Sequence, residues 1–158
     1  MSVSPAQLEA FAAELAATPE RWRHLISAAG GARAYEPIWS DEDVNAWVIC
    51  WHDDNDTGWH DHDESAGGIA VIAGRVREER LVMGAEPRVR HLGPGETFTV
   101  PATAIHRVRH DGGGPAITIH AYSPPLTRMG AYRVGPDGEL ERESLPSGTE
   151  LQPQAAAA

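Results

Sequence analysis

Three histidines stand in two short segments of the chain, at spacings that suit a shared metal site. His60 and His62 belong to the strand-like stretch Trp59-His60-Asp61-His62. Because side chains alternate along a strand, both imidazoles point to the same face. His106 begins a second strand-like segment, and imidazole is a common metal ligand. The three residues are therefore candidate ligands, although three unrelated polar histidines remain the alternative from spacing alone.

The charge of the chain favours a small-molecule partner over nucleic acid. The 158 residues include 13 Lys and Arg against 23 Asp and Glu, for a formal net charge of -10. This charge repels a phosphate backbone and an anionic membrane surface. Every basic residue is arginine, so mechanisms that use a lysine base or a Schiff base are excluded.

The chain also carries no sign of export or of a membrane span. Met1 to Leu15 lacks the basic flank and the apolar run of a signal peptide, and the longest apolar run, Ile69 to Ala73, is too short to cross a bilayer. The single cysteine, Cys50, cannot form an intramolecular disulfide, and we expect it to be a small buried apolar residue. We expect a cytoplasmic protein that binds neither membrane nor nucleic acid; the sequence leaves its oligomeric state open.

Short strands must hold the histidines in place. Ser4-Pro5 opens one amphipathic helix, and Thr18-Pro19-Glu20 opens a second that should stop at Gly30-Gly31. Thereafter apolar runs alternate with turn residues, which predicts an all-β barrel or sandwich with strands near 46–51, 68–73, 97–100 and 116–122. We expect a helical segment over residues 1–31 packed on the barrel, the barrel over 32–145, and a mobile tail over 146–158.

The spacing of the histidines and glycines resembles the two motifs of the cupin family. His60, His62 and the closing Gly74 match the first motif, and the second motif is matched by Gly95, Pro101 and His106. The resemblance implies a double-stranded β-helix, or jelly-roll barrel, with two short N-terminal helices before it. Gly67 stands where the family has a glutamate ligand, so the implied site has three neutral histidines and no carboxylate. Glu64 continues the alternation of His60 and His62, but we expect it to be a solvated loop residue.

A narrower resemblance is to the cysteine dioxygenase group of thiol dioxygenases. Cys50-Trp51, Ile105-His106-Arg107-Val108 and Thr118-Ile119-His120-Ala121-Tyr122-Ser123-Pro124-Pro125 carry it. It implies an Fe(II) enzyme that adds both atoms of O2 to the sulfur of a small thiol or thione, giving a sulfinate. It also implies that Tyr122, His120 and Thr118 form a hydrogen-bonded catalytic chain beside the iron, and that the Ser123-Pro124 bond is cis. In the animal enzymes a cysteine crosslinked to the tyrosine occupies the position of Gly67, so no crosslink is expected here.

The substrate residues are harder to assign than the ligands. The family binds the substrate carboxylate with an arginine upstream of the barrel, and Arg33 is near that place. Trp51 and Trp59 are candidates for the substrate wall. Aromatic faces and carboxylates suit a cationic sulfur compound such as ergothioneine, and such residues gather before the ligands (Trp47, Trp51, Trp59, Asp53, Asp54 and Asp56). Core tryptophans beside a solvated acidic turn are the alternative.

Two other functions remain open at this point. The same metal site would suit a cupin isomerase or a ring-cleaving dioxygenase. A cupin without catalytic activity that binds a small ligand is the third hypothesis.

Overall fold

The computed structural model describes residues 3–26 and 34–147. Helix α1 (Pro5–Ala16) starts as predicted, with Ser4 and Gln7 forming a reciprocal capping box and proline in the first turn. The expected second helix is divided within the described residues into a 3-10 turn, η1 (Pro19–Arg21), and a helical segment, α2 (Arg23–Ile26). Its expected end at Gly30-Gly31 lies outside the described residues.

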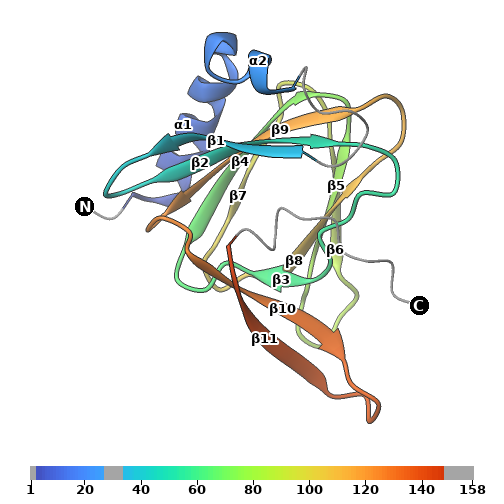
Figure 1. Cartoon of the computed structure of the whole chain (residues 1–158). Coiled ribbons are helices and arrows are strands. Elements are labelled where there is room, and N and C mark those ends of the chain that lie inside the picture. The colour runs from blue at the N-terminus through green and yellow to red at the C-terminus, as the bar shows by residue number, and fades with distance from the viewer. Residues whose placement is uncertain (1–2, 27–33, 148–158) are drawn as a thin grey trace.

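In the described part of the chain, eleven strands form two antiparallel sheets. The two sheets face each other, as Figure 1 shows. The order in the five-stranded sheet is β1 (Ala34–Ser40), β2 (Asn45–Trp51), β9 (Ala116–Ser123), β4 (Ala66–Ala73) and β7 (Thr97–Val100). The order in the six-stranded sheet is β11 (Leu140–Pro146), β10 (Arg128–Val134), β3 (His60–Asp61), β8 (His106–His110), β5 (Val76–Arg80) and β6 (Arg88–Leu92).

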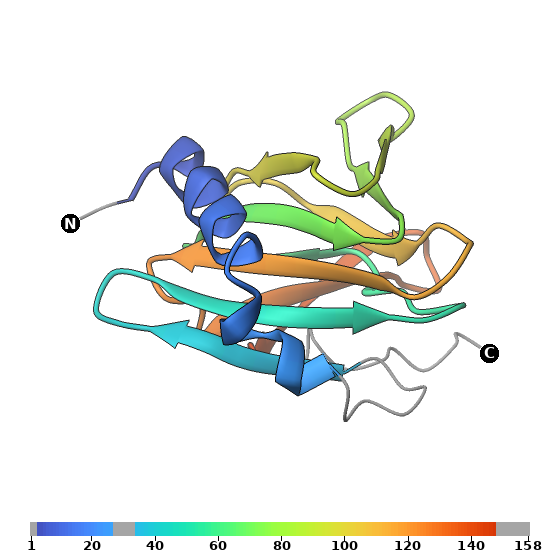
Figure 2. The same cartoon turned by 90° about the horizontal axis from the view of Figure 1, so that it is seen from above.

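Helix α1 lies across the outer face of the five-stranded sheet (Figure 2). Leu8, Ala12 and Leu15 of the helix pack in one cluster with Ala70 and Ile119 of the sheet. The helix backbone approaches closely at Gly68, where an added Cβ would lie 2.3 Å from the carbonyl carbon of Leu8. A second core fills the space between the sheets, with contributions from β2, β4, β5, β7 and β8. The central strands of the five-stranded sheet, β2, β9 and β4, are therefore buried on both faces over most of their length.

The hairpin of β10 and β11 was not predicted. It pairs over seven residues from each strand and extends the six-stranded sheet beyond β3. Strand β11 reaches Pro146, the residue at which the predicted tail begins, and residues 148–158 lie outside the described part of the chain. Among the described helices, none has the length and apolar character needed to span a membrane.

Candidate metal centre

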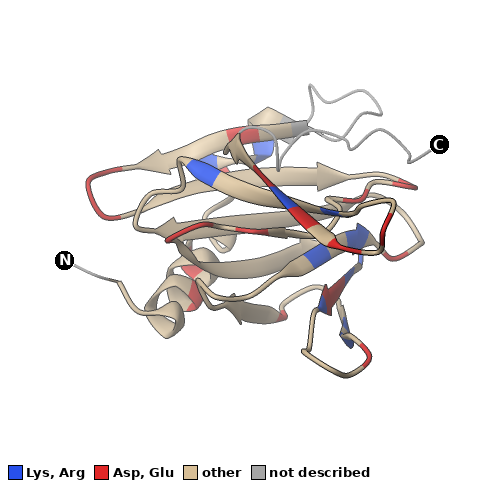
Figure 3. Cartoon of the chain, turned by 90° about the horizontal axis from the view of Figure 1, so that it is seen from below, with Lys and Arg blue, Asp and Glu red and all other residues tan. Residues whose placement is uncertain are grey.

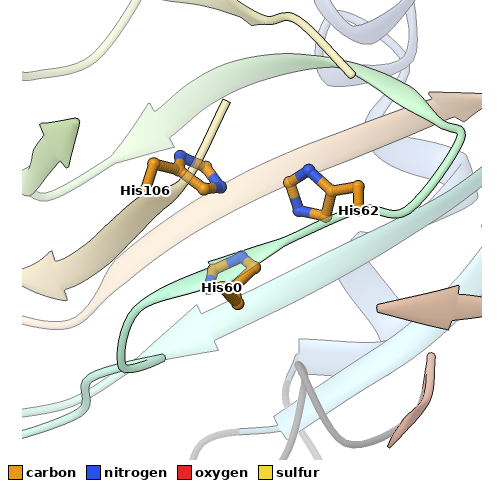
Figure 4. A group of neighbouring side chains, drawn as sticks. All are labelled: His60, His62 and His106. Atoms are coloured by element: carbon orange, nitrogen blue, oxygen red, sulfur yellow. The ribbon is translucent and has the colours of Figure 1, made fainter. Parts of the chain in front are cut away.

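The structure brings the three predicted ligands together between the two sheets. His60 lies on β3 directly opposite His106 of β8, and His62 follows at the end of β3. All three residues are almost completely buried, and one ligand atom from each lies within 4.8 Å of the other two. Figure 4 shows the three rings turned toward a common point.

Two hydrogen bonds fix how the rings are turned. Nδ1 of His60 is 2.9 Å from the carbonyl oxygen of Gly58, and Nδ1 of His106 is 2.8 Å from Oε2 of Glu78. The second nitrogen of His106, Nε2, is buried and has no hydrogen-bond partner among the described residues. A buried acceptor nitrogen without a partner is costly unless a ligand satisfies it, so the group suits a metal ion.

The buried position also keeps His106 in the form that binds metal. Burial lowers its pKa to about 3, against the hydrogen bond that its Nδ1–H donates to Glu78, and the neighbouring His60 and His62 act in the same direction as burial. Metal ligation requires the neutral imidazole. His106 is therefore in its ligating form throughout the physiological range.

Glu78 is a functional residue that the sequence analysis missed. Its side chain is 1% exposed, and its carboxylate accepts hydrogen bonds from His106, Arg80 and Arg90. Burial acts to raise its pKa, but the hydrogen bonds from His106, Arg90 and Arg80 outweigh burial and hold the pKa at about 2. The sequence contained one signal for this role. Glu78 is an acidic residue two positions after Val76, so both side chains lie on the same, buried face of β5.

Asp61, between two of the ligands, points the opposite way and anchors their strand. It accepts hydrogen bonds from the hydroxyl of Tyr132 and the guanidinium of Arg142, both on the hairpin of β10 and β11, and from the amide of Gly130. Burial acts to raise the pKa of Asp61, but the bonds from Arg142 and Tyr132 dominate and hold it well below the ordinary value. The unpredicted hairpin thus fixes the short strand that carries His60.

Thr118, His120 and Tyr122 form the expected chain of hydrogen bonds along β9. Oγ1 of Thr118 is 2.9 Å from Nε2 of His120, and Nδ1 of His120 is 3.1 Å from the hydroxyl of Tyr122. Trp51 of β2 extends the chain, because its indole nitrogen donates to Oγ1 of Thr118 at 2.9 Å. The ring of Tyr122 lies with its centroid 4.7 Å from that of His62, so the chain ends beside the histidines.

Gly67 lies directly opposite Tyr122 on β4, as the comparison of motifs implied. A Cβ at this position would be 3.1 Å from Cε1 of Tyr122, so a side chain here would press on the tyrosine ring. The Ser123-Pro124 bond is cis, which confirms the prediction. Cys50 is buried and forms no disulfide, also as predicted.

The structure does not place Trp51 and Trp59, two of the residues proposed to bind the substrate, in one pocket. Arg33 lies outside the described residues. Trp51 is fully buried in the hydrogen-bonded chain, and Trp59 lines a separate apolar pocket of about 170 Å³ on the six-stranded sheet, together with Leu81, Ile105, Tyr132, Val134 and Leu140. The ring centroid of Trp47 lies 5.9 Å from that of Tyr122.

Two of the acidic residues before His60 have partners other than the three candidate ligands. Asp56 forms ion pairs with Arg107 and Arg109, and Asp53 contacts His110. Their charges therefore contribute to the strand contacts of β8 more than to a pocket wall. Glu64 is exposed in the turn after His62 and is not in the described ligand group, as expected.

Comparison with known proteins identifies the family. The model of the family "Cysteine dioxygenase type I" matches residues 13–134. The chain belongs to the cysteine dioxygenase type I family. This confirms the resemblance drawn from the motifs, and the three described histidines could hold a metal ion.

The individual relatives are more distant. The chain is 25% identical over 92 residues to cysteine dioxygenase type 1 of Danio rerio, covering 52% of this chain and 46% of the relative. It is 34% identical over 84 residues to germin-like protein 3-8 of Oryza sativa subsp. japonica, covering 51% of this chain and 37% of the relative. The chain thus spans less than half the length of these relatives.

A solved structure supports the fold. The protein with a double-stranded β-helix domain from Klebsiella pneumoniae subsp. pneumoniae MGH 78578 superimposes with a TM-score of 0.52 at 17% identity, covering 72% of this chain and 86% of that one. The predicted cupin fold is confirmed.

Proposed function

We propose that this protein is a non-haem Fe(II) thiol dioxygenase that converts a small thiol or thione into a sulfinate. Both oxygen atoms of O2 are added to sulfur, and sulfur supplies all the electrons that O2 accepts, so no external reductant is needed. The observation that carries the proposal is the hydroxyl of Tyr122, held by His120 beside three buried histidines in a member of the cysteine dioxygenase family.

His60, His62 and His106 would hold the iron. When bound, the iron supplies a site at which a sulfur anion and O2 can meet. Three neutral imidazoles leave the charge of the metal uncompensated, because the described ligand group contains no carboxylate. A thiolate can supply the missing negative charge, so this ligand set favours sulfur anions over neutral ligands.

Tyr122 would donate a hydrogen bond to the oxygen or the substrate. The indole of Trp51 can only donate, so Oγ1 of Thr118 accepts its proton. In the proposed arrangement the Thr118 hydroxyl donates to Nε2 of His120, and Nδ1–H of His120 donates to the oxygen of Tyr122. This order leaves the hydroxyl hydrogen of Tyr122 to point at the reacting groups, where a preoriented donor stabilises developing negative charge.

The substrate proposal covers two classes of sulfur compound. Arg33 would bind the carboxylate of a cysteine-like thiol. The aromatic side chain of Trp47, close to Tyr122, would instead suit a cationic thione such as ergothioneine. We also propose a cytoplasmic location, because thiols stay reduced there.

Oxygen consumption by the iron-loaded protein tests the proposal. Cysteine, 3-mercaptopropionate, cysteamine and ergothioneine are offered in turn, and mass spectrometry looks for a product heavier by both atoms of ¹⁸O₂. We expect one of the four to give this product, and His106→Ala to give none. Glu64→Ala is the matched control and should remain active. If the iron-loaded protein gives no such product with any of them, the dioxygenase proposal is wrong.

A further inference from the structure

His60 and His106 differ in the group that their Nδ1 nitrogen contacts. Nδ1 of His60 faces a neutral carbonyl oxygen, that of Gly58, whereas Nδ1 of His106 faces the carboxylate of Glu78. A charged acceptor draws the Nδ1 proton more strongly than a neutral one. The opposite nitrogen of the same ring then carries more electron density and binds a metal more strongly.

The carboxylate is in turn held by two arginines. Arg90 lies directly opposite Glu78 on β6 and donates to Oε1 at 2.7 Å, while Arg80 donates to Oε2 at 2.9 Å. Arg80 also donates to the carbonyl of Thr99, and the guanidinium of Arg90 lies 5.1 Å from the centre of the Phe98 ring. These contacts fix the position of Glu78 and offset its charge.

We propose that Glu78 is a positioning residue that makes His106 a more strongly donating ligand than His60, and that Arg80 and Arg90 limit this effect by offsetting the Glu78 charge. The inference rests on the proposed metal binding by the three histidines. Through His106, Glu78 controls both the affinity of the site for the metal and the balance between the oxidation states of the metal. Negative charge near the metal favours the ferric over the ferrous state. Each substitution among Glu78, Arg80 and Arg90 should therefore shift the reduction potential of the iron in a definite direction.

Glu78→Gln tests the affinity, with Glu79→Gln as the matched control. Glutamine keeps the size and one acceptor oxygen but removes the charge. Glu79 is the next residue on β5 and is also buried, but it pairs with Arg77 and Arg107 instead. In anaerobic titrations with Fe(II) alone, Glu78→Gln should weaken binding about 10- to 100-fold, as is typical for the loss of a partner behind a histidine ligand. Glu79→Gln should bind like the wild type, and equal affinities of the two variants would overturn the inference.

The reduction potential of the bound iron provides a readout that a merely structural role would not move in the same way. Glu78→Gln should make the potential more positive, and Arg90→Met should make it more negative. In Glu78→Gln/Arg90→Met the effect of the arginine change should shrink, because its partner is already neutral. Arg77→Met removes a cation from β5, the strand of Glu78, and should shift the potential less than Arg90→Met does. Shifts of the same sign in Glu78→Gln and Arg90→Met would contradict the assignment.

The outcomes separate this inference from the proposed function. The titration is repeated with Co(II), which reports on the ligands without oxygen chemistry. If Glu78→Gln weakens Co(II) and Fe(II) while no sulfur compound is oxidised, the inference stands and the dioxygenase proposal fails. If sulfur is oxidised but Glu78→Gln changes neither affinity nor potential, only the inference fails. Should Glu78→Gln not fold by circular dichroism, Arg90→Met decides alone, and an unchanged potential overturns the inference.

Discussion

The two sheets support the site in different ways. Each strand of the six-stranded sheet contains a charged residue, whereas β2, β4, β7 and β9 of the five-stranded sheet contain none. Figure 3 shows acidic and basic positions interspersed along the six-stranded sheet. The five-stranded sheet lies between helix α1 and the core, and a strand that is dry on both faces has no place for a charge.

This difference divides the site by the kind of interaction. The ligands belong to the charged sheet, where Glu78 stands behind His106 and Asp61 anchors β3. The hydrogen-bonded chain from Trp51 to Tyr122 lies on β2 and β9, two strands without charged residues, and contains no carboxylate or guanidinium. Changes on the six-stranded sheet should therefore act on metal binding through charge. Changes on the five-stranded sheet should act on the reaction through geometry.

The largest effect is expected from removing a ligand on the charged sheet. His106→Ala should lose more than about 100-fold in Fe(II) affinity, beyond the range typical of a residue that only supports a ligand. Elemental analysis of protein from iron-supplemented cells measures the loss. Thr118→Ala, on the other sheet, should keep its iron. Equal iron losses in the two variants would contradict the assignment of metal binding to the six-stranded sheet.

The next effect concerns the hydrogen-bonded chain on the five-stranded sheet. Tyr122→Phe should lower kcat about 100-fold, because one preoriented donor is lost, while iron content stays unchanged. Trp51→Phe should lower kcat about 5-fold, since it removes a neutral hydrogen bond worth about 1 kcal/mol from the far end of the chain. Steady-state oxygen uptake with the active substrate, beside iron analysis, checks both values. Iron loss in Tyr122→Phe would show that the five-stranded sheet also contributes to metal binding, which contradicts this assignment.

The same contrast decided which strands could be predicted from the sequence. β2, β4, β7 and β9 are short apolar runs bounded by turn residues, so their pattern stood out from the chain. β6 and β10 are interrupted by arginines, β11 alternates glutamate and arginine, and β11 is exposed over most of its length, so none of the three has the short apolar run that marks the other strands. Their strand form depends on partners that are distant in the sequence.

The site was predictable to a similar extent. His60, His62 and His106 were identified because their spacing matches the cupin motifs, and His120 and Tyr122 because their segment resembles the cysteine dioxygenase motif. Glu78 was missed because its role depends on β5 lying beside β8, which brings it to His106 from 28 residues away. The acidic run before His60 suggested a pocket wall, but the fold pairs Asp56 with arginines of β8.

A smaller effect, on stability, is expected where the five-stranded sheet meets helix α1. Gly68→Ala should lower the free energy of unfolding by about 1–3 kcal/mol, because the new Cβ would lie 2.3 Å from helix backbone that cannot easily move. Gly67→Ala on the inner face meets the ring of Tyr122 at 3.1 Å and should cost less stability while lowering kcat. Urea denaturation and kcat together test the pair. Similar stability losses in both variants would contradict this account.

The smallest effect is expected from a charge that lies on the six-stranded side but outside the metal site. Burial acts to raise the pKa of Asp56, but hydrogen bonds from Arg107 and the amide of Gly58 outweigh it, so the pKa lies below the ordinary 3.8. A carboxyl whose pKa is lowered on folding stabilises the protein above its unfolded pKa, and this contribution is lost as the pH falls. Asp56→Asn should therefore cost up to about 1 kcal/mol at pH 7, the range of a partly exposed ion pair, and less in acid.

Urea denaturation at neutral pH and at pH values below 3.8 measures this difference for Asp56→Asn and for the wild type. Asp53→Asn is the control, since its side chain is 83% exposed and should matter little at either pH. Iron content and the Michaelis constant should be unchanged in Asp56→Asn, because its carboxylate contacts arginines and not the histidines. A raised Michaelis constant for a cationic thione would show instead that Asp56 contributes to the substrate wall, and that charge on this side of the molecule acts on the reaction as well as on the metal.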